Sequence, residues 1–174
     1  MKKTVTILIL FLIIISAINK TKKVVIPKEA IRFRVIANSN TNIDQNNKKK
    51  IAKELSYDLV NILSETNSIE EARNTIQSNI SNFETTVNQI VEKENYDTTV
   101  SIEYGNHYFP EKKYKGVTYE SGEYESLVVK LGQGKGENFW CVLFPPLCLL
   151  EAEENETDEV RYKSFIKEII DKYF

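Results

Sequence analysis

The chain has 174 residues, with 23 Lys and Arg against 25 Asp and Glu, so its net charge at pH 7 is −2. This length fits one domain, and a charge balance so close to zero argues against a nucleic-acid-binding protein, which would carry a basic face. Six Gly, four Pro and two Cys exclude collagen, low-complexity chains and disulfide-dense miniproteins, and a single His excludes a multi-histidine metal site.

Residues 1–18 have the pattern of an export segment. A basic start (MKK) precedes an uncharged run of 14 residues, from Val5 to Ile18. The run is shorter than the ~20 residues that a membrane-spanning helix needs, and a basic start followed by a short apolar run is typical of a secretory signal. Because the run ends in a poor cleavage site, a cleaved signal peptide and a short uncleaved anchor both remain open. Residues 19–28 follow as a Lys-rich linker.

The folded domain, residues 29–150, is predicted to begin with a half-buried strand. Between residues 30 and 36 apolar side chains alternate with Arg32 and Arg34, so the apolar face would be buried and the arginine face exposed. A polar turn at 37–41 ends this strand.

Two helices are predicted next. The first runs from about Asp44 to Ile62, with apolar residues at steps of three or four. The second opens with a capping box formed by Ser68 and Glu71 and continues to Ile90 as one helix with heptad spacing. Because a partner helix is adjacent in sequence, we expect a helical hairpin; a two-chain coiled coil is the alternative.

Three further strands are predicted at 100–104, 127–131 and 139–144. The last is apolar on both faces, which favours a central position in a sheet. The glycine-rich segment 132–138 is predicted to be a hairpin loop, because no helix follows it to form a phosphate site. The fold class is therefore α+β: a helical hairpin and a C-terminal helix packed on a small, mainly antiparallel sheet, after the signal or anchor segment.

Residues 151–174 are predicted to form an acidic linker and a C-terminal amphipathic helix. Six acidic residues occur between Glu151 and Glu159, and residues 162–173 place their apolar side chains on one helical face. A helix this short is marginal alone in water. We expect it to dock on its own sheet; a partner or a membrane surface is the alternative.

Cys141 and Cys148 are predicted to form a disulfide, because an even cysteine count in an exported chain favours one. Six residues separate them, so the chain must reverse between them, and Pro145-Pro146 can supply that reversal, through a cis bond if needed. Two buried thiols are the alternative.

The sequence shows no catalytic set, and we expect no enzyme and no cofactor. A Cys–His hydrolase would need His107 beside a free thiol, and no nucleophile motif of the G-x-S-x-G type is present. An exported protein without catalytic residues is expected to bind a partner.

Three stretches of the sequence carry a family resemblance. The first is RFRVIANSNT (32–41), followed by DQ (44–45) and Lys48. The second is YGN (104–106) with FP (109–110) and, later, GEYESL (122–127). The third is LGQGKGENFWCVLFPPLC (131–148). Together they resemble the stage II sporulation protein R family of spore-forming Firmicutes, over roughly residues 30–150. The resemblance implies a signalling protein that is secreted into the space between forespore and mother cell. There it would activate a membrane-embedded aspartic protease of the stage II sporulation GA type, which processes the precursor of the first mother-cell sigma factor.

Six residues within these stretches are candidates for contact with that partner. Five belong to the polar turn and the start of the first helix, and one to the third stretch: Asn38, Ser39, Asn40, Asp44, Gln45 and Trp140. Loops on a rigid scaffold are where binding residues concentrate, but the five can also be caps and turn formers. A peripheral membrane contact is a further expectation. The alternative functions are an envelope-anchored module that binds wall polymer and the Cys–His hydrolase.

Overall fold

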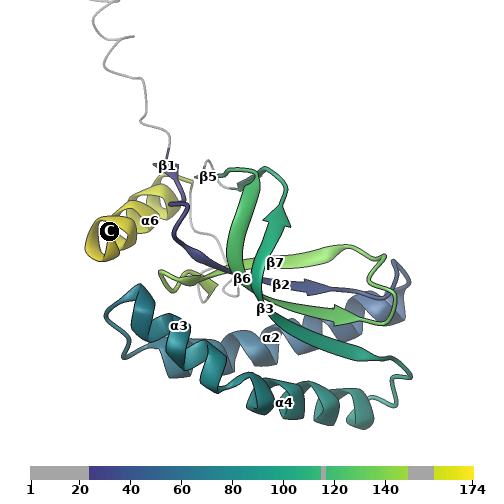
Figure 1. Ribbon diagram of the computed structural model, residues 1–174. Helices are drawn as coiled ribbons and strands as arrows, with labels where there is room; N and C mark the ends of the chain where they lie inside the picture. The colour runs from purple at the N-terminus through teal and green to yellow at the C-terminus, as the bar shows by residue number, and fades with distance from the viewer. Residues whose placement is uncertain (1–23, 115–116, 149–158) are drawn as a thin grey trace, which may run out of the picture.

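A computed structural model describes residues 24–114, 117–148 and 159–174 (Figure 1). The predicted signal segment, the start of its linker and the acidic linker 151–158 lie outside the described residues. The described part is an α+β fold, as expected. Its strands are β1 (Val24–Val25), β2 (Ile31–Ile36), β3 (Val100–Phe109), β4 (Lys112–Tyr114), β5 (Val117–Tyr119), β6 (Gly122–Leu131) and β7 (Asn138–Phe144). Its helices are α2 (Asn42–Leu63), α3 (Ile69–Ser78), α4 (Ile80–Lys93) and α6 (Glu159–Tyr173).

The main sheet has four strands in the order β3-β6-β2-β7. β3 and β6 pair antiparallel along their whole length, and β2 pairs antiparallel with β7. β2 and β6 are parallel, with Phe33 opposite Leu127 and Val35 opposite Val129. The sheet is therefore mixed and mainly antiparallel. A second sheet, in the order β1-β5-β4, was not predicted because its strands are only two or three residues long.

The glycine-rich segment is not a hairpin loop, and this prediction is wrong. β6 and β7, which it connects, are not neighbours, since β2 lies between them. The segment crosses the end of β2 instead, where the backbone N–H of Gly136 donates to Ala37, 2.9 Å away. Local sequence shows that two strands are joined by a short loop, but it does not show that a third strand is inserted between them.

β7 is an edge strand, so the prediction of a central position is also wrong. It is apolar on both faces for another reason. Cys141 and Leu143 face the helices, whereas Val142 is buried on the other face against Leu147 and Ile166. Burial of both faces thus comes from two separate apolar clusters and not from strands on both sides.

Helices α2, α3 and α4 cover one face of the main sheet, as Figure 1 shows. Leu55 and Leu59 of α2 pack in the same fully buried cluster as Ile76 of α3 and Val87 of α4. The hairpin is confirmed: the heptad seam of the second helix faces α2 within one chain. Burial of such an apolar stripe supplies most of the stability of helices of this length.

The second helix is divided in two at Asn79, where we predicted one continuous helix. Asn79 leaves the helical conformation, with φ −105° and ψ 5°. Its side-chain amide donates to the backbone carbonyl of Thr75, 2.9 Å away, and its Oδ1 accepts from Asn82. Asparagine competes in this way with helical backbone hydrogen bonds. The start of α3 is as predicted, since Ser68 caps it by accepting from the N–H of Glu71.

The C-terminal helix α6 docks on its own domain beside β1 (Figure 1), as expected. Ile166 is fully buried against Ile26 and Leu147. The ring of Tyr173 meets that of Phe144 edge-on, with 5.0 Å between centroids. No helix of the described part of the chain is long and apolar enough to cross a membrane.

Candidate functional site

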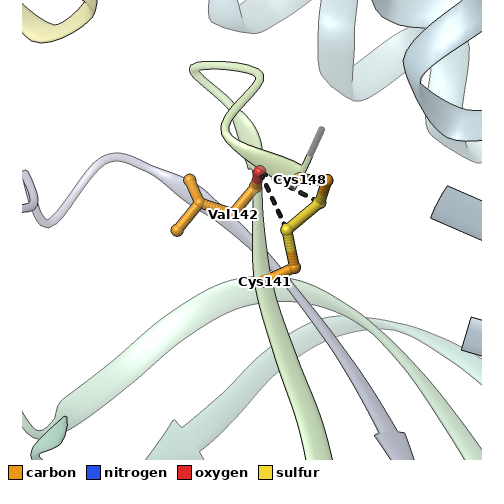
Figure 2. The surroundings of a disulfide bond; sticks show 3 residues. All are labelled: Cys141, Val142 and Cys148. Carbon is orange, nitrogen blue, oxygen red and sulfur yellow. Dashed lines mark hydrogen bonds between the residues drawn. A yellow bond between two sulfur atoms is a disulfide. The ribbon is translucent and has the colours of Figure 1, made fainter. Parts of the chain in front are cut away.

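The predicted disulfide between Cys141 and Cys148 is present (Figure 2). The chain reverses at Pro145 after a cis Phe144–Pro145 bond, which brings the two Cα atoms to 5.4 Å. Both sulfur atoms lie against the carbonyl oxygen of Val142, at 3.6 and 3.2 Å. With both cysteines in the bond, the chain has no free thiol for a Cys–His site.

The single histidine lies in a Ser–His–Glu arrangement between β3 and β6. Its Nδ1 is 2.8 Å from the hydroxyl of Ser126, and its Nε2 is 3.8 Å from the carboxylate of Glu103. Ser126 is completely buried and donates to the backbone carbonyl of Tyr124, 3.3 Å away. A buried hydroxyl cannot reach a substrate as the structure stands, so His107 serves to join the two strands. The described residues hold no cluster of His, Cys, Asp or Glu that could bind a metal.

Asp44 is the centre of the predicted polar turn. It is buried and accepts hydrogen bonds from Ser39 Oγ at 2.5 Å, Asn38 Nδ2 at 3.0 Å and Tyr96 Oη at 2.6 Å. These donors, Ser39 first, hold the pKa of Asp44 below its ordinary value. Thr41, and not one of the candidates, is the cap of α2.

The polar turn also fixes the glycine-rich segment. Oδ1 of Asn38 accepts from the N–H of Gln133 at 2.9 Å, and Oδ1 of Asn40 accepts from the N–H of Glu137 at 2.7 Å. Gln45 donates to the carbonyl of Ser39. Five of the six candidates are therefore brought together, and they bind one another and the crossing segment. Their contact with a partner stays a prediction.

Trp140, the sixth candidate, lies apart from these five, on the sheet face that the three helices do not cover. β2 contributes Arg32 and Arg34 to this face, and β3 contributes Phe109. The Arg34 guanidinium lies 5.3 Å from the centroid of the Trp140 ring and 5.6 Å from that of Phe109. Arg32 lies 5.2 Å from Phe109 and only 3.3 Å from the ring centroid of Tyr124. The two arginines of β2 thus lie among rings from the other three strands of the main sheet, an arrangement that is favourable through cation–π attraction.

Beside this stack is a pocket of about 600 Å³, within the range of about 300–1,000 Å³ typical of ligand sites. We call it the arginine–aromatic groove. Among the described residues that line it, the basic ones are Arg32, Lys112 and Lys113, and the acidic one is Glu137. Its aromatic residues are Phe109, Tyr114, Tyr119 and Trp140. The groove therefore suits a ligand that combines negative charge with an apolar surface.

Arg32 is buried, contrary to the half-buried strand that we predicted. Only 2% of its surface is exposed, because Phe109 and Tyr124 cover it. Burial lowers the pKa of both Arg32 and Arg34. Alternation with apolar residues correctly separated the two faces of β2. It gave no sign that the rings of β3 and β6 would cover the arginine face.

The groove adjoins the polar turn through Glu137 and Asn138. Both line the groove, and Glu137 is held by Asn40 and by Lys48, whose Nζ donates to its carbonyl at 3.1 Å. Asn40 thus helps to position one wall of the groove, and Trp140 forms part of the groove itself.

Comparison with known proteins covers this whole site. The family model described as stage II sporulation protein R matches residues 27–154. Stage II sporulation protein R of Bacillus subtilis (strain 168) is 37% identical over 168 residues, which cover 90% of this chain and 75% of that protein. No solved structure matches. The matched residues include the main sheet, the polar turn, the groove and the disulfide, and on this match the chain belongs to the stage II sporulation protein R family.

Proposed function

We propose that this protein is an exported signal of sporulation that activates a membrane-embedded aspartic protease of the stage II sporulation GA type. Its place of action would be the space between forespore and mother cell, and the outcome would be processing of the mother-cell sigma factor precursor. The observation that carries the proposal is family membership over residues 27–154, nearly the whole described domain. Membership itself gives the chain a role in sporulation.

Two features of the structure support an extracellular binding role. The disulfide between Cys141 and Cys148 suits an oxidising compartment. The arginine–aromatic groove offers a preformed surface on a domain whose one histidine is used in strand pairing. A preformed site limits the entropy lost on binding.

A binding protein can activate a protease by preferring its active state. A ligand shifts a conformational equilibrium only by the difference in its affinity for the two states. Aspartic proteases need two carboxylates that share one site. Stabilising the receptor arrangement in which these two carboxylates meet would therefore be sufficient, and this chain would need no catalytic residue.

The test is deletion of the gene in its sporulating host, with the sigma factor precursor followed by immunoblot. We expect the precursor to accumulate unprocessed, and processing to return when the gene is restored under its own promoter. A catalytically inactive receptor protease, combined with the restored gene, is the control and should leave the precursor intact. Normal processing in the deletion strain would disprove the proposed function.

A further inference from the structure

Arg32, which lines the arginine–aromatic groove, and Arg34 beside it carry positive charge that no described carboxylate pairs with. Arg32 and Arg34 form no ion pair within 4.0 Å among the side chains that the structure describes. The Nε atoms of both are buried and have no hydrogen-bond partner there. Their recorded hydrogen bonds to backbone are long, at 3.4 Å to Glu120 and 3.3 Å to Tyr108. Buried charged groups are nearly always paired, so the unpaired positive charge of the buried Arg32 favours an anionic ligand in the groove.

The groove also contains an unused acceptor and exposed ring surface. Oδ1 of Asn138 is buried without a hydrogen-bond partner among the described residues, so it requires an N–H or O–H donor. Trp140 and Phe109 border the same pocket with apolar surface. A small inorganic anion would match the positive charge of the groove and leave these other groups unused. A peptide supplies carboxylates, backbone N–H groups and apolar side chains together.

The shape of the site favours an extended segment. Asn138, Trp140, Cys141 and Val142 line the groove, and all belong to β7, which is an edge strand. The Cys141 side chain is directed into the helix-facing core and its disulfide, so the contribution of Cys141 to the groove comes from its backbone. Extended peptides bind along edge strands in this way, with side chains in adjacent pockets.

We propose that the groove binds an extended acidic segment of a protein partner, with its carboxylates at the exposed Lys112 and Lys113, near the positive charge of Arg32, and an apolar side chain on Trp140. The inference rests on the proposed function, in which that partner is the receptor protease. Exposed lysines attract and orient carboxylates, and the buried guanidinium of Arg32 adds positive charge that water screens only weakly. This would make the groove the surface that recognises the receptor.

Trp140 is the only tryptophan, so its fluorescence reports on the groove directly. The purified exported protein is titrated with a blocked peptide of sequence DEFDE and with its uncharged counterpart NQFNQ. We expect a saturable change with DEFDE in the millimolar range or tighter, about tenfold weaker binding of NQFNQ, and weakening of the DEFDE complex by added salt. Absence of a saturable response to DEFDE, or equal binding of both peptides, would overturn the proposal.

Charge reversal at the rim of the groove provides the matched variants. Lys112→Glu with Lys113→Glu alters exposed residues of β4, whereas Lys53→Glu with Lys93→Glu makes the same charge change on exposed helix positions. Both should keep the wild-type melting temperature. We expect the rim variant to bind DEFDE about tenfold more weakly and the helix variant to bind it as the wild type does.

The same two variants in sporulating cells separate this inference from the proposed function. If deletion of the gene blocks precursor processing and only the rim variant fails to restore it, both proposals stand. If the rim variant restores processing fully, the groove proposal fails while the function stands. If purified cell-wall sacculi retain the wild type but not the rim variant, and DEFDE gives no response, the groove binds wall polymer and the proposal is overturned.

Discussion

The hydroxyl of Tyr96 donates to Oδ1 of Asp44 across 2.6 Å, and so connects the segment after α4 to the first turn of α2. Asp44 also accepts from Asn38 and Ser39. Desolvation, followed by the hydrogen bond to Asp44, raises the pKa of Tyr96 to about 12, so this hydroxyl remains a donor at every pH of interest. One carboxylate thus links two helices and the polar turn.

Replacing Asp44 with Ala should therefore destabilise the fold. We expect the free energy of unfolding to fall by about 2–3 kcal/mol, because the hydrogen bonds of a charged acceptor are lost and Tyr96 keeps a buried donor without a partner. Urea unfolding followed by circular dichroism measures the change. Glu54→Ala, at an exposed position of the same helix, is the control and should stay within about 0.5 kcal/mol of the wild type. A stable Asp44→Ala protein would point to a role in partner contact.

Stability should decrease in acid through two carboxylates. The pKa of Asp44 is lowered by Ser39 and Tyr96, and that of Glu125 is lowered by its two hydrogen bonds from Arg73. A carboxylate whose pKa is lower in the folded state stabilises the protein above the unfolded pKa, about 3.9 for Asp and about 4.3 for Glu. That stabilisation disappears as the pH falls through the folded-state pKa.

Urea midpoints measured at several pH values between 7 and 2 should therefore be constant near neutrality and decline below about pH 4. The Asp44→Asn variant should begin with a lower midpoint and show a smaller decline, because one of the two titrating groups is absent. An equal decline in both proteins would show that Asp44 does not contribute.

The crossing segment should not tolerate a side chain at Gly132. This residue has φ +54°, and a Cβ there would lie 2.3 Å from Oδ1 of Asn38. We expect Gly132→Ala to lower the free energy of unfolding by about 1–3 kcal/mol, through backbone strain and displacement of Asn38. Gly105→Ala is the matched control, since a Cβ at Gly105 in β3 meets nothing within 4 Å. Differential scanning calorimetry should show a large decrease in melting temperature for the first variant alone.

Reduction of the disulfide should weaken the domain without abolishing its sheet. A short closed loop between Cys141 and Cys148 predicts a loss of about 2–3 kcal/mol from chain entropy. Non-reduced exported protein should have an intact mass two hydrogens below the reduced form. The double variant Cys141→Ala with Cys148→Ala should match the reduced wild type in urea, and should not respond to reductant. Two free thiols in freshly exported protein would contradict the pairing.

Export should depend on the apolar run at the start of the chain. Leu10→Lys with Leu12→Lys places two charges in that run, each of which costs about 2.5–3.5 kcal/mol in an apolar segment. We expect the variant to stay in the forespore cytoplasm and the precursor to remain unprocessed, as seen by fractionation and immunoblot. Leu10→Ile with Leu12→Ile keeps the hydropathy and should be exported normally. Export of the lysine variant would disprove the signal function of the run.

Periodicity and local chemistry predicted several helices, a helix cap and the disulfide of this protein from the sequence alone. The three- and four-residue spacing around Leu55 and Leu59 predicted α2, because a helix needs only one apolar stripe to be buried. Ser68 predicted the start of α3, since a cap depends on neighbouring backbone alone. The even cysteine count in a chain with an export-type start predicted the disulfide, and the two prolines supplied the local reversal that it needs.

Only the tertiary structure decided which strands are neighbours and what covers each face. Alternation in β2 marked two faces, but pairing between strands far apart in sequence placed β2 between β6 and β7. That placement directed the glycine-rich segment across the end of β2 and brought Phe109, Tyr124 and Trp140 over the two arginines. Contacts of this kind depend on the burial of surfaces that are separated by about a hundred residues. A local pattern carries no information about the residues that will cover such a surface.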